Sequence, residues 1–106
     1  MEKFVLIITT TDKKEDADKI ASFLVEKKLA ACVQVIGPIE STYRWKGKVE
    51  KSREWLCFIK SRENLLSEIE KRLREIHPYE VPEIVALPII GGYKDYLSWV
   101  IKETTG

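Results

Sequence analysis

The stretch from Leu29 to Lys60, LAACVQVIGPIESTYRWKGKVEKSREWLCFIK, decides the fold. Its two ends are rich in the β-branched, aromatic and aliphatic residues that are typical of strands. Lys46-Gly47-Lys48 lies between them and is typical of a hairpin turn. Gly37-Pro38 interrupts the first arm, and proline cannot continue a hydrogen-bonded ladder. The pattern therefore predicts one long β-hairpin with a bend or bulge at Gly37-Pro38.

The length of this hairpin predicts an interface. Arms of ~12 residues or more at ~3.3 Å per residue span ~40 Å, which is longer than a domain of this size covers by itself. The outer half carries Tyr43, Trp45 and several charges. An uncovered edge of this kind favours either aggregation or assembly. We expect it to be an interface between copies of the chain.

The pattern of the segment before the hairpin predicts a strand followed by a helix. The apolar run within Lys3 to Thr10 predicts a strand that is covered on both faces. Asp12 followed by Glu15 resembles a capping box, which begins a helix. Apolar residues at helical spacing extend that helix over residues 13–28.

The segment after the hairpin predicts a helix, a strand and a final helix. Ser61 is the predicted cap of the first helix, whose apolar stripe ends at Ile76. Ile84 to Leu87 is the predicted strand, stopped by Pro88, and a last helix follows Gly91-Gly92. The order is β-α-β-β-α-β plus a helix. It predicts a single α+β domain over 1–106, the ferredoxin-like split βαβ fold, with an antiparallel sheet and two helices on one face.

Composition narrows the function classes. The 106 residues have a formal net charge of +1, which argues against a nucleic-acid-binding protein. The chain shows no signal-peptide pattern and no apolar run near the ~20 residues that cross a bilayer, so we expect a soluble cytoplasmic protein without membrane contact. One Asn, one Gln and one Met beside 33% charged residues are typical of a heat-adapted protein.

The stretch His77-Pro78-Tyr79-Glu80-Val81-Pro82 concentrates the chemistry of the chain. It contains the only histidine, a phenol and a carboxylate, and its two prolines predict a stiff connection rather than a helix or a central strand. The chain has no nucleophile motif and no glycine-rich phosphate loop. A general acid–base pair of His77 and Glu80 has no diagnostic spacing. We therefore expect no enzyme.

Metal binding and a structural role are both open for the same residues. Imidazole and thiolate ligands suit copper or zinc, yet the chain has no closely spaced Cys or His pair. A lone histidine at the end of a helix also fits a role as a helix cap. Cys32 and Cys57 lie in apolar runs, where buried core thiols are the usual interpretation.

Four stretches resemble the CutA family of divalent-cation tolerance proteins. The resemblance spans nearly the whole chain, and Tyr96-Leu97-Ser98-Trp99 is similar to the family's final helix. The four stretches are Leu29-Ala30-Ala31-Cys32-Val33-Gln34, Ser41-Thr42-Tyr43-Arg44-Trp45-Lys46-Gly47-Lys48, Glu54 with the strand to Lys60, and His77-Pro78-Tyr79-Glu80-Val81-Pro82-Glu83-Ile84.

The resemblance implies an assembly and a class of ligand. It implies a cytoplasmic homotrimer built by strand pairing between protomers, associated with copper and other divalent ions. It also implies a likeness to PII-type signalling trimers, whose ligands bind between subunits. Thr9 and Ile76 stand where the family's proposed copper ligands include a cysteine and a first histidine.

These considerations give one predicted site and two functions. The predicted metal ligands are His77, Cys32 and Glu80, with Glu83 as a further oxygen donor, and no cofactor is obligatory. The predicted function is binding of a divalent metal, copper first, in metal tolerance. The alternative is a PII-like module for a small anionic ligand or a partner protein. The predicted lining of an intersubunit cleft is Tyr43, Trp45, Lys60 and Tyr79.

Overall fold

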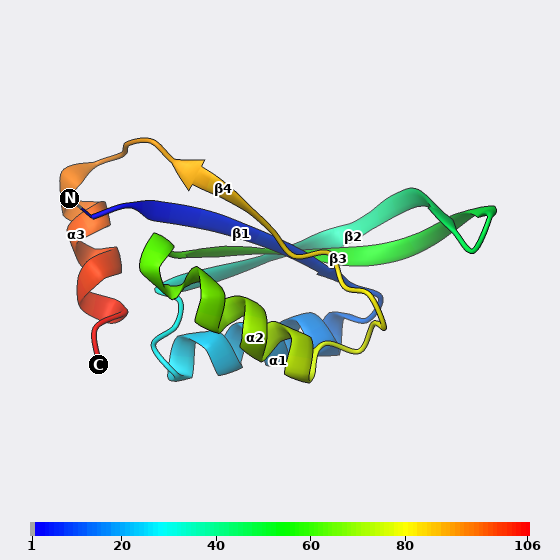
Figure 1. Cartoon of the computed structure of the whole chain (residues 1–106), viewed down its shortest axis with the longest axis horizontal. Coiled ribbons are helices and arrows are strands. Elements are labelled where there is room, and N and C mark those ends of the chain that lie inside the picture. Colours follow the sequence, from blue (N-terminus) through cyan, green and yellow to red (C-terminus); the bar gives the residue numbers. More distant parts are fainter. Residues whose placement is uncertain (1) are drawn as a thin grey trace.

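The computed structural model describes residues 2–106 and has the predicted α+β fold (Figure 1). The strand order is β2-β3-β1-β4, and every neighbouring pair is antiparallel. This is the ferredoxin-like arrangement that the sequence predicts. The elements are β1 (Phe4–Thr11), α1 (Lys14–Glu26), β2 (Cys32–Trp45), β3 (Lys48–Arg62), a 3-10 turn (Glu63–Leu65), α2 (Leu66–Ile76), β4 (Val85–Ile89) and α3 (Lys94–Glu103).

The core lies between one face of the sheet and the helices α1 and α2 (Figure 1). Side chains alternate along a strand, so every second residue of β1 and β3 points at the helices. Each helix contributes an apolar stripe to the same layer. The buried cluster consists of Val5, Ile7, Ala17, Ile20, Leu24, Ala30, Cys57, Ile59, Ile69 and Leu73.

The hairpin of β2 and β3 is the longest feature of the molecule. Its strands have 14 and 15 residues, and the longest dimension of the chain is 44 Å. The turn places Lys46 and Gly47 at positive φ, 50° and 80°; glycine adopts this region without steric cost, whereas Lys46 adopts it as a non-glycine residue. Figure 1 shows the outer half of the hairpin extending beyond the helices and the other strands. The predicted overlong hairpin is confirmed.

The predicted irregularity in β2 is also confirmed. The register with β3 shifts between Ile36 and Ile39, and the Gly37-Pro38 peptide within this bulge is cis. A Cβ atom on Gly37 would lie 2.5 Å from Cδ1 of Trp55. Glycine is therefore required here because the indole of Trp55 packs directly against the backbone.

Two predicted helix caps are wrong. The N-cap of α1 is Lys13 and makes no side-chain capping bond, so Asp12 does not cap the helix. Thr11 instead donates its hydroxyl to the Lys13 carbonyl over 2.8 Å. Ser61 lies within β3, and its hydroxyl donates to the Leu29 carbonyl over 2.6 Å. Strand pairing extends past Ser61 because β1 continues opposite it.

The C-terminal part differs slightly from its prediction. Strand β4 continues through Pro88 to Ile89, where a stop was predicted. Proline is compatible with this position because β4 is an edge strand of the sheet. Helix α3 follows at the end of the sheet (Figure 1). Arg62 of β3 fixes its C-terminus by donating to the Thr104 hydroxyl and carbonyl over 2.8 and 2.7 Å.

The second face of the sheet is apolar and lies opposite α1 and α2. The registers place Ile8, Phe58 and Val85 side by side across three strands of this face. Their neighbours Ile36 and Leu87 are more than two-fifths exposed in the single chain. Exposed apolar surface of this extent is typical of a contact face. Among residues 2–106, no helix has the length and apolar character needed to cross a membrane.

Candidate functional site

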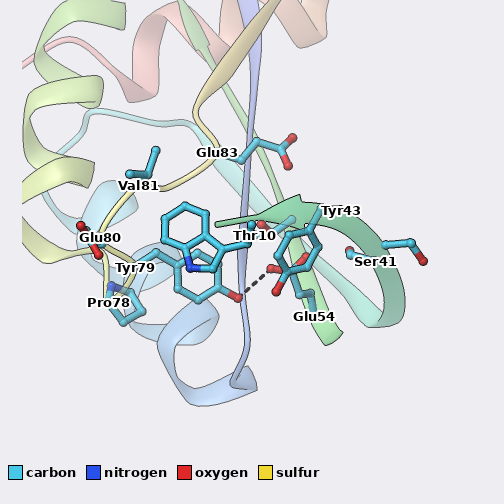
Figure 2. A pocket seen from close by; sticks show the side chains of 11 residues that line it. Thr10, Ser41, Tyr43, Glu54, Pro78, Tyr79, Glu80, Val81 and Glu83 are labelled. Carbon is cyan, nitrogen blue, oxygen red and sulfur yellow. Dashed lines mark hydrogen bonds between the residues drawn. The ribbon is translucent and has the colours of Figure 1, made fainter. Parts of the chain in front are cut away.

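A cavity of about 710 Å³ lies between the middle of the hairpin and the loop after α2 (Figure 2). One wall comes from β2 and β3, the other from residues 78–83, and the end of β1 contributes one threonine. This volume is in the range of small-molecule sites. The lining residues are Thr10, Ser41, Thr42, Tyr43, Trp45, Glu54, Pro78, Tyr79, Glu80, Val81 and Glu83.

A hydrogen bond between Tyr79 and Glu54 joins the two walls. The Tyr79 hydroxyl donates to Oε2 of Glu54 over 2.6 Å (Figure 2). Burial raises the pKa of Tyr79 far above its usual value, and the bond to Glu54 raises it further. The phenol therefore stays neutral and acts as a donor to the carboxylate. Bonds of this kind to a charged acceptor are stronger than those between neutral groups.

Glu54 is the most unusual side chain of the cavity. It is only 6% exposed. Tyr79 is its one hydrogen-bond partner within residues 2–106, and none of the lysines, arginines or the histidine described there lies within 4.0 Å of its carboxylate. A buried carboxylate normally has a cation or several donors as partners. The fold therefore leaves a negative charge beside the cavity with incomplete compensation.

The imidazole of His77 holds the loop against the sheet. The Tyr79 backbone N–H donates to Nδ1 over 3.1 Å, so Nδ1 carries no proton, and Nε2–H donates to the Thr10 carbonyl over 2.8 Å. The pairing of β4 with β1 ends at Ile8. The imidazole of His77 therefore donates to a β1 carbonyl that lies beyond the reach of β4. Burial lowers the pKa of His77, and the Thr10 bond partly opposes this. His77 thus fixes the position of Tyr79.

The three predicted metal ligands do not form one group in this chain. Cys32 pairs with Lys60, and Lys60 pairs with Leu6 of β1, whereas His77 bonds to Thr10 four residues further along. That offset alone is ~13 Å at 3.3 Å per residue. Glu80 is exposed on the loop. Among residues 2–106, no three His, Cys, Asp or Glu side chains are grouped closely enough to hold a metal ion.

The two cysteines have different surroundings. Cys57 is fully buried in the core, as predicted, with its Sγ 3.9 Å from the Ala17 carbonyl. Burial raises the pKa of its thiol to about 11, with a smaller contribution from Asp18. Cys32 is partly exposed on β2. Only Cys32 is therefore accessible as a thiol ligand in the single chain.

Three of the four predicted cleft residues lie together. Tyr43, Trp45 and Tyr79 line the cavity, whereas Lys60 lies at a second cavity of about 240 Å³ beside α3. The Lys60 ammonium there lies 5.7 Å from the centre of the Tyr96 ring. Sequence patterns do not single out Glu54 as a site residue. The signal that the sequence offers is a glutamate directly before the apolar run of β3.

Comparisons with known proteins agree with this fold. A sequence model of the family described as CutA1 divalent ion tolerance protein matches residues 5–103. The divalent-cation tolerance protein CutA of Thermus thermophilus is 44% identical over 106 residues, covering all of both chains. The chloroplastic protein CutA of Arabidopsis thaliana is 41% identical over 100 residues, but this chain spans only 55% of its length.

A solved structure extends the likeness to three dimensions. The crystal structure of CutA1 from Oryza sativa is 40% identical and superposes with a TM-score of 0.94, covering 97% of this chain and 94% of that one. The family match covers almost every residue of the sheet and helices described above. The chain therefore belongs to the CutA1 divalent ion tolerance protein family.

Proposed function

We propose that this protein serves tolerance of divalent metal ions and binds such ions at the cavity between the hairpin and the loop of residues 78–83. The names of its relatives refer to divalent-cation tolerance, which supports this role. The observation that carries the proposal is the charge of the lining. The acidic residues Glu54, Glu80 and Glu83 line the cavity, and its lining among residues 2–106 includes no lysine, arginine or histidine. A cleft lined by one sign of charge concentrates ions of the other sign.

We propose copper as the principal ion, with His77 as its nitrogen ligand. Both ring nitrogens have hydrogen-bond partners, at Thr10 and Tyr79. A metal ion must therefore replace one partner before it can bind the ring. Harder divalent ions do not need to displace a hydrogen-bond partner of His77, because they prefer carboxylate oxygens and water as ligands. Glu80 and Glu83 supply carboxylate oxygens at the loop.

Metal titrations of variants test both parts of this proposal. We expect Cu(II) and Cu(I) to bind more weakly to His77→Ala than to the original protein. A double variant, Glu80→Gln with Glu83→Gln, should weaken Zn(II) and Mn(II) more than Cu(I), because Cu(I) prefers softer ligands. Cys32→Ser serves as a comparison because Cys32 lies far along the sheet from His77. Equal copper affinities of the original protein and His77→Ala would remove His77 as a ligand.

We further propose that the protein is a homotrimer in the cytoplasm. The apolar second face of the sheet and the outer half of the hairpin support assembly, because neither is covered by α1 or α2 (Figure 1). Light scattering at micromolar concentration should give three times the mass of the 12.3 kDa chain. A monomer mass would contradict the trimer.

The PII-like alternative receives support from the size of the cavity but not from its charge. A volume of about 710 Å³ suits a small organic molecule. However, three carboxylates disfavour an anionic ligand of the kind that this alternative assumes. Stabilisation of the protein by an organic acid or a nucleotide in EDTA would favour the alternative over metal binding.

A further inference from the structure

We propose that the same cavity binds an organic ammonium ion, with the ammonium group against Glu54 and the aromatic side chains of the hairpin. This inference shares the cationic preference of the proposed function but does not require that any metal bind. The ligand class follows from three properties of the cavity: its size, its buried charge and its aromatic walls. The size and the aromatic walls favour an organic molecule over a bare ion, and the buried charge disfavours an anion.

The size of the cavity fits a small organic molecule. Its volume is about 710 Å³, within the ~300–1,000 Å³ of small-molecule sites. A single metal ion with direct protein ligands occupies far less space. Moreover, no three acidic, histidine or cysteine side chains among residues 2–106 are grouped at metal-ligand spacing. A larger cation makes use of space that a bare ion leaves empty.

The buried charge of Glu54 specifies a cation. Its Oε2 accepts the Tyr79 hydroxyl, while Oε1 has no hydrogen-bond partner within residues 2–106. Glu54 is more than nine-tenths buried, yet it lines the cavity, so this oxygen is accessible from that side. A charge in such a position is strongly stabilised by a cation that reaches it. An ammonium group supplies both the charge and N–H donors or polarised methyl groups.

The aromatic side chains favour an organic cation over a hydrated metal ion. Tyr79 contacts the Glu54 carboxylate through its hydroxyl, and Tyr43 lines the same cavity (Figure 2). Trp45 also lines the cavity, and 39% of it is exposed in the single chain. Aromatic faces attract ammonium groups, and they pack against the carbon atoms of the same ligand. Glu80 and Glu83 on the opposite wall add charge of the same sign to the lining.

Paired ligands that differ only in charge test this proposal. The full-length assembled protein, kept in EDTA, is titrated calorimetrically with choline and with its neutral counterpart 3,3-dimethylbutan-1-ol. A second pair is protonated 1-butylamine and 1-butanol. We expect saturable binding of at least one ammonium compound, and binding at least about tenfold weaker for its neutral counterpart. Chemical-shift changes at the Trp45 indole N–H should accompany binding and locate it in the cavity.

Two variants separate the role of Glu54 from the integrity of the fold. Glu54→Gln keeps an oxygen acceptor for the Tyr79 hydroxyl and removes the charge, so ammonium binding should weaken at least about tenfold. Glu103→Gln on α3 is the matched control and should bind like the original protein, because α3 lies at the end of the sheet (Figure 1). Equal unfolding midpoints for both variants exclude a general loss of structure.

Several outcomes would overturn the inference. These are no binding of either ammonium compound, equal binding of charged and neutral partners, or undiminished binding to Glu54→Gln. Absence of amine binding in an assembly whose Glu54 is paired with a lysine or arginine of a neighbouring copy would also refute it. Metal titrations in EDTA-free buffer are a separate measurement, so divalent-ion binding can fail or succeed independently of ammonium binding.

Discussion

Replacing His77 by alanine should destabilise the protein even when no metal is present. The ring makes two hydrogen bonds, from Nε2–H to the Thr10 carbonyl and from the Tyr79 N–H to Nδ1, and His77 is 8% exposed. Each such bond contributes ~1 kcal/mol, and buried partners left without a bond cost ~1–3 kcal/mol more. We expect a loss of about 3 kcal/mol in the free energy of unfolding. That loss lowers the Tm by roughly 10–20 °C.

Guanidinium unfolding in EDTA at one fixed protomer concentration measures this loss. The fixed concentration matters because assembly shifts the apparent stability. His77→Gln is the matched variant, since its amide can still donate to the Thr10 carbonyl, and it should recover about half of the loss. Hydrogen exchange of the Tyr79 amide should accelerate in His77→Ala, because that N–H loses its acceptor.

The opposite result would refute a clamping role for His77. If His77→Ala unfolds within about 0.5 kcal/mol of the original protein in EDTA, the two hydrogen bonds contribute little to the fold. A simultaneous loss of copper affinity would then show that the ring acts mainly as a metal ligand. Unchanged hydrogen exchange at the Tyr79 amide in His77→Ala would likewise show that the bond from this amide to His77 contributes little to the fold.

Four further predictions follow from single features of the structure. Burial lowers the pKa of His77 below its usual 6.5, so the unfolded chain gains the proton first as pH falls. The free energy of unfolding should therefore fall between pH 7.5 and 5.5, more steeply than in His77→Gln, and equal slopes would refute this. Gly37→Ala should cost about 1–3 kcal/mol because its Cβ would meet the Trp55 indole, whereas Gly91→Ala, with no atom within 4 Å of its Cβ, should stay within about 0.5 kcal/mol. Cys57, with a pKa of about 11, should resist iodoacetamide at pH 8 until the protein unfolds, and modification in the folded state would contradict its burial. The charge-rich composition predicts a Tm above the ~45–65 °C of mesophilic domains, which calorimetry measures.

The fold could be predicted because its determinants are local in sequence. The hairpin follows from strand-forming runs around Gly47, and the bulge follows from Gly37-Pro38. The two helix caps could not be predicted this way. Asp12 and Ser61 have suitable side chains, but the paired strands β1 and β3 extend into these positions and determine the partners instead.

The candidate site could be predicted only in part, because its central contact is long-range. Tyr79 was predictable as a site residue from the dense chemistry of its loop. Its partner Glu54 lies 25 positions earlier in the chain, and only the packing of the loop on the hairpin brings the two together. Lys60 shares the hairpin with Trp45 but lies near its other end, at the cavity beside α3. The turn predicted at Lys46-Gly47-Lys48 already places Trp45 and Lys60 near opposite ends of the hairpin, so their separation was predictable from sequence position.

The contacts of His77 could not be predicted from the sequence either, because its bond to β1 is also long-range. A histidine between a helix and a proline is compatible with a metal ligand and with a helix cap. In the single chain its ring bonds to the Thr10 carbonyl of β1, 67 positions away, and to the Tyr79 backbone N–H. The end of the β1–β4 ladder creates the need for this donor, and that end is set by tertiary structure.

A ligand-stabilisation screen of the original protein and Glu54→Gln tests most directly whether the cavity is a cation site. The compounds are divalent metal ions, ammonium compounds in EDTA, and organic acids and nucleotides in EDTA. A ligand at 100 times its Kd stabilises the native state by about 2.7 kcal/mol. The cavity predicts stabilisation by cations only, reduced in Glu54→Gln. Stabilisation by anions alone, or equal cation effects in both proteins, would contradict it.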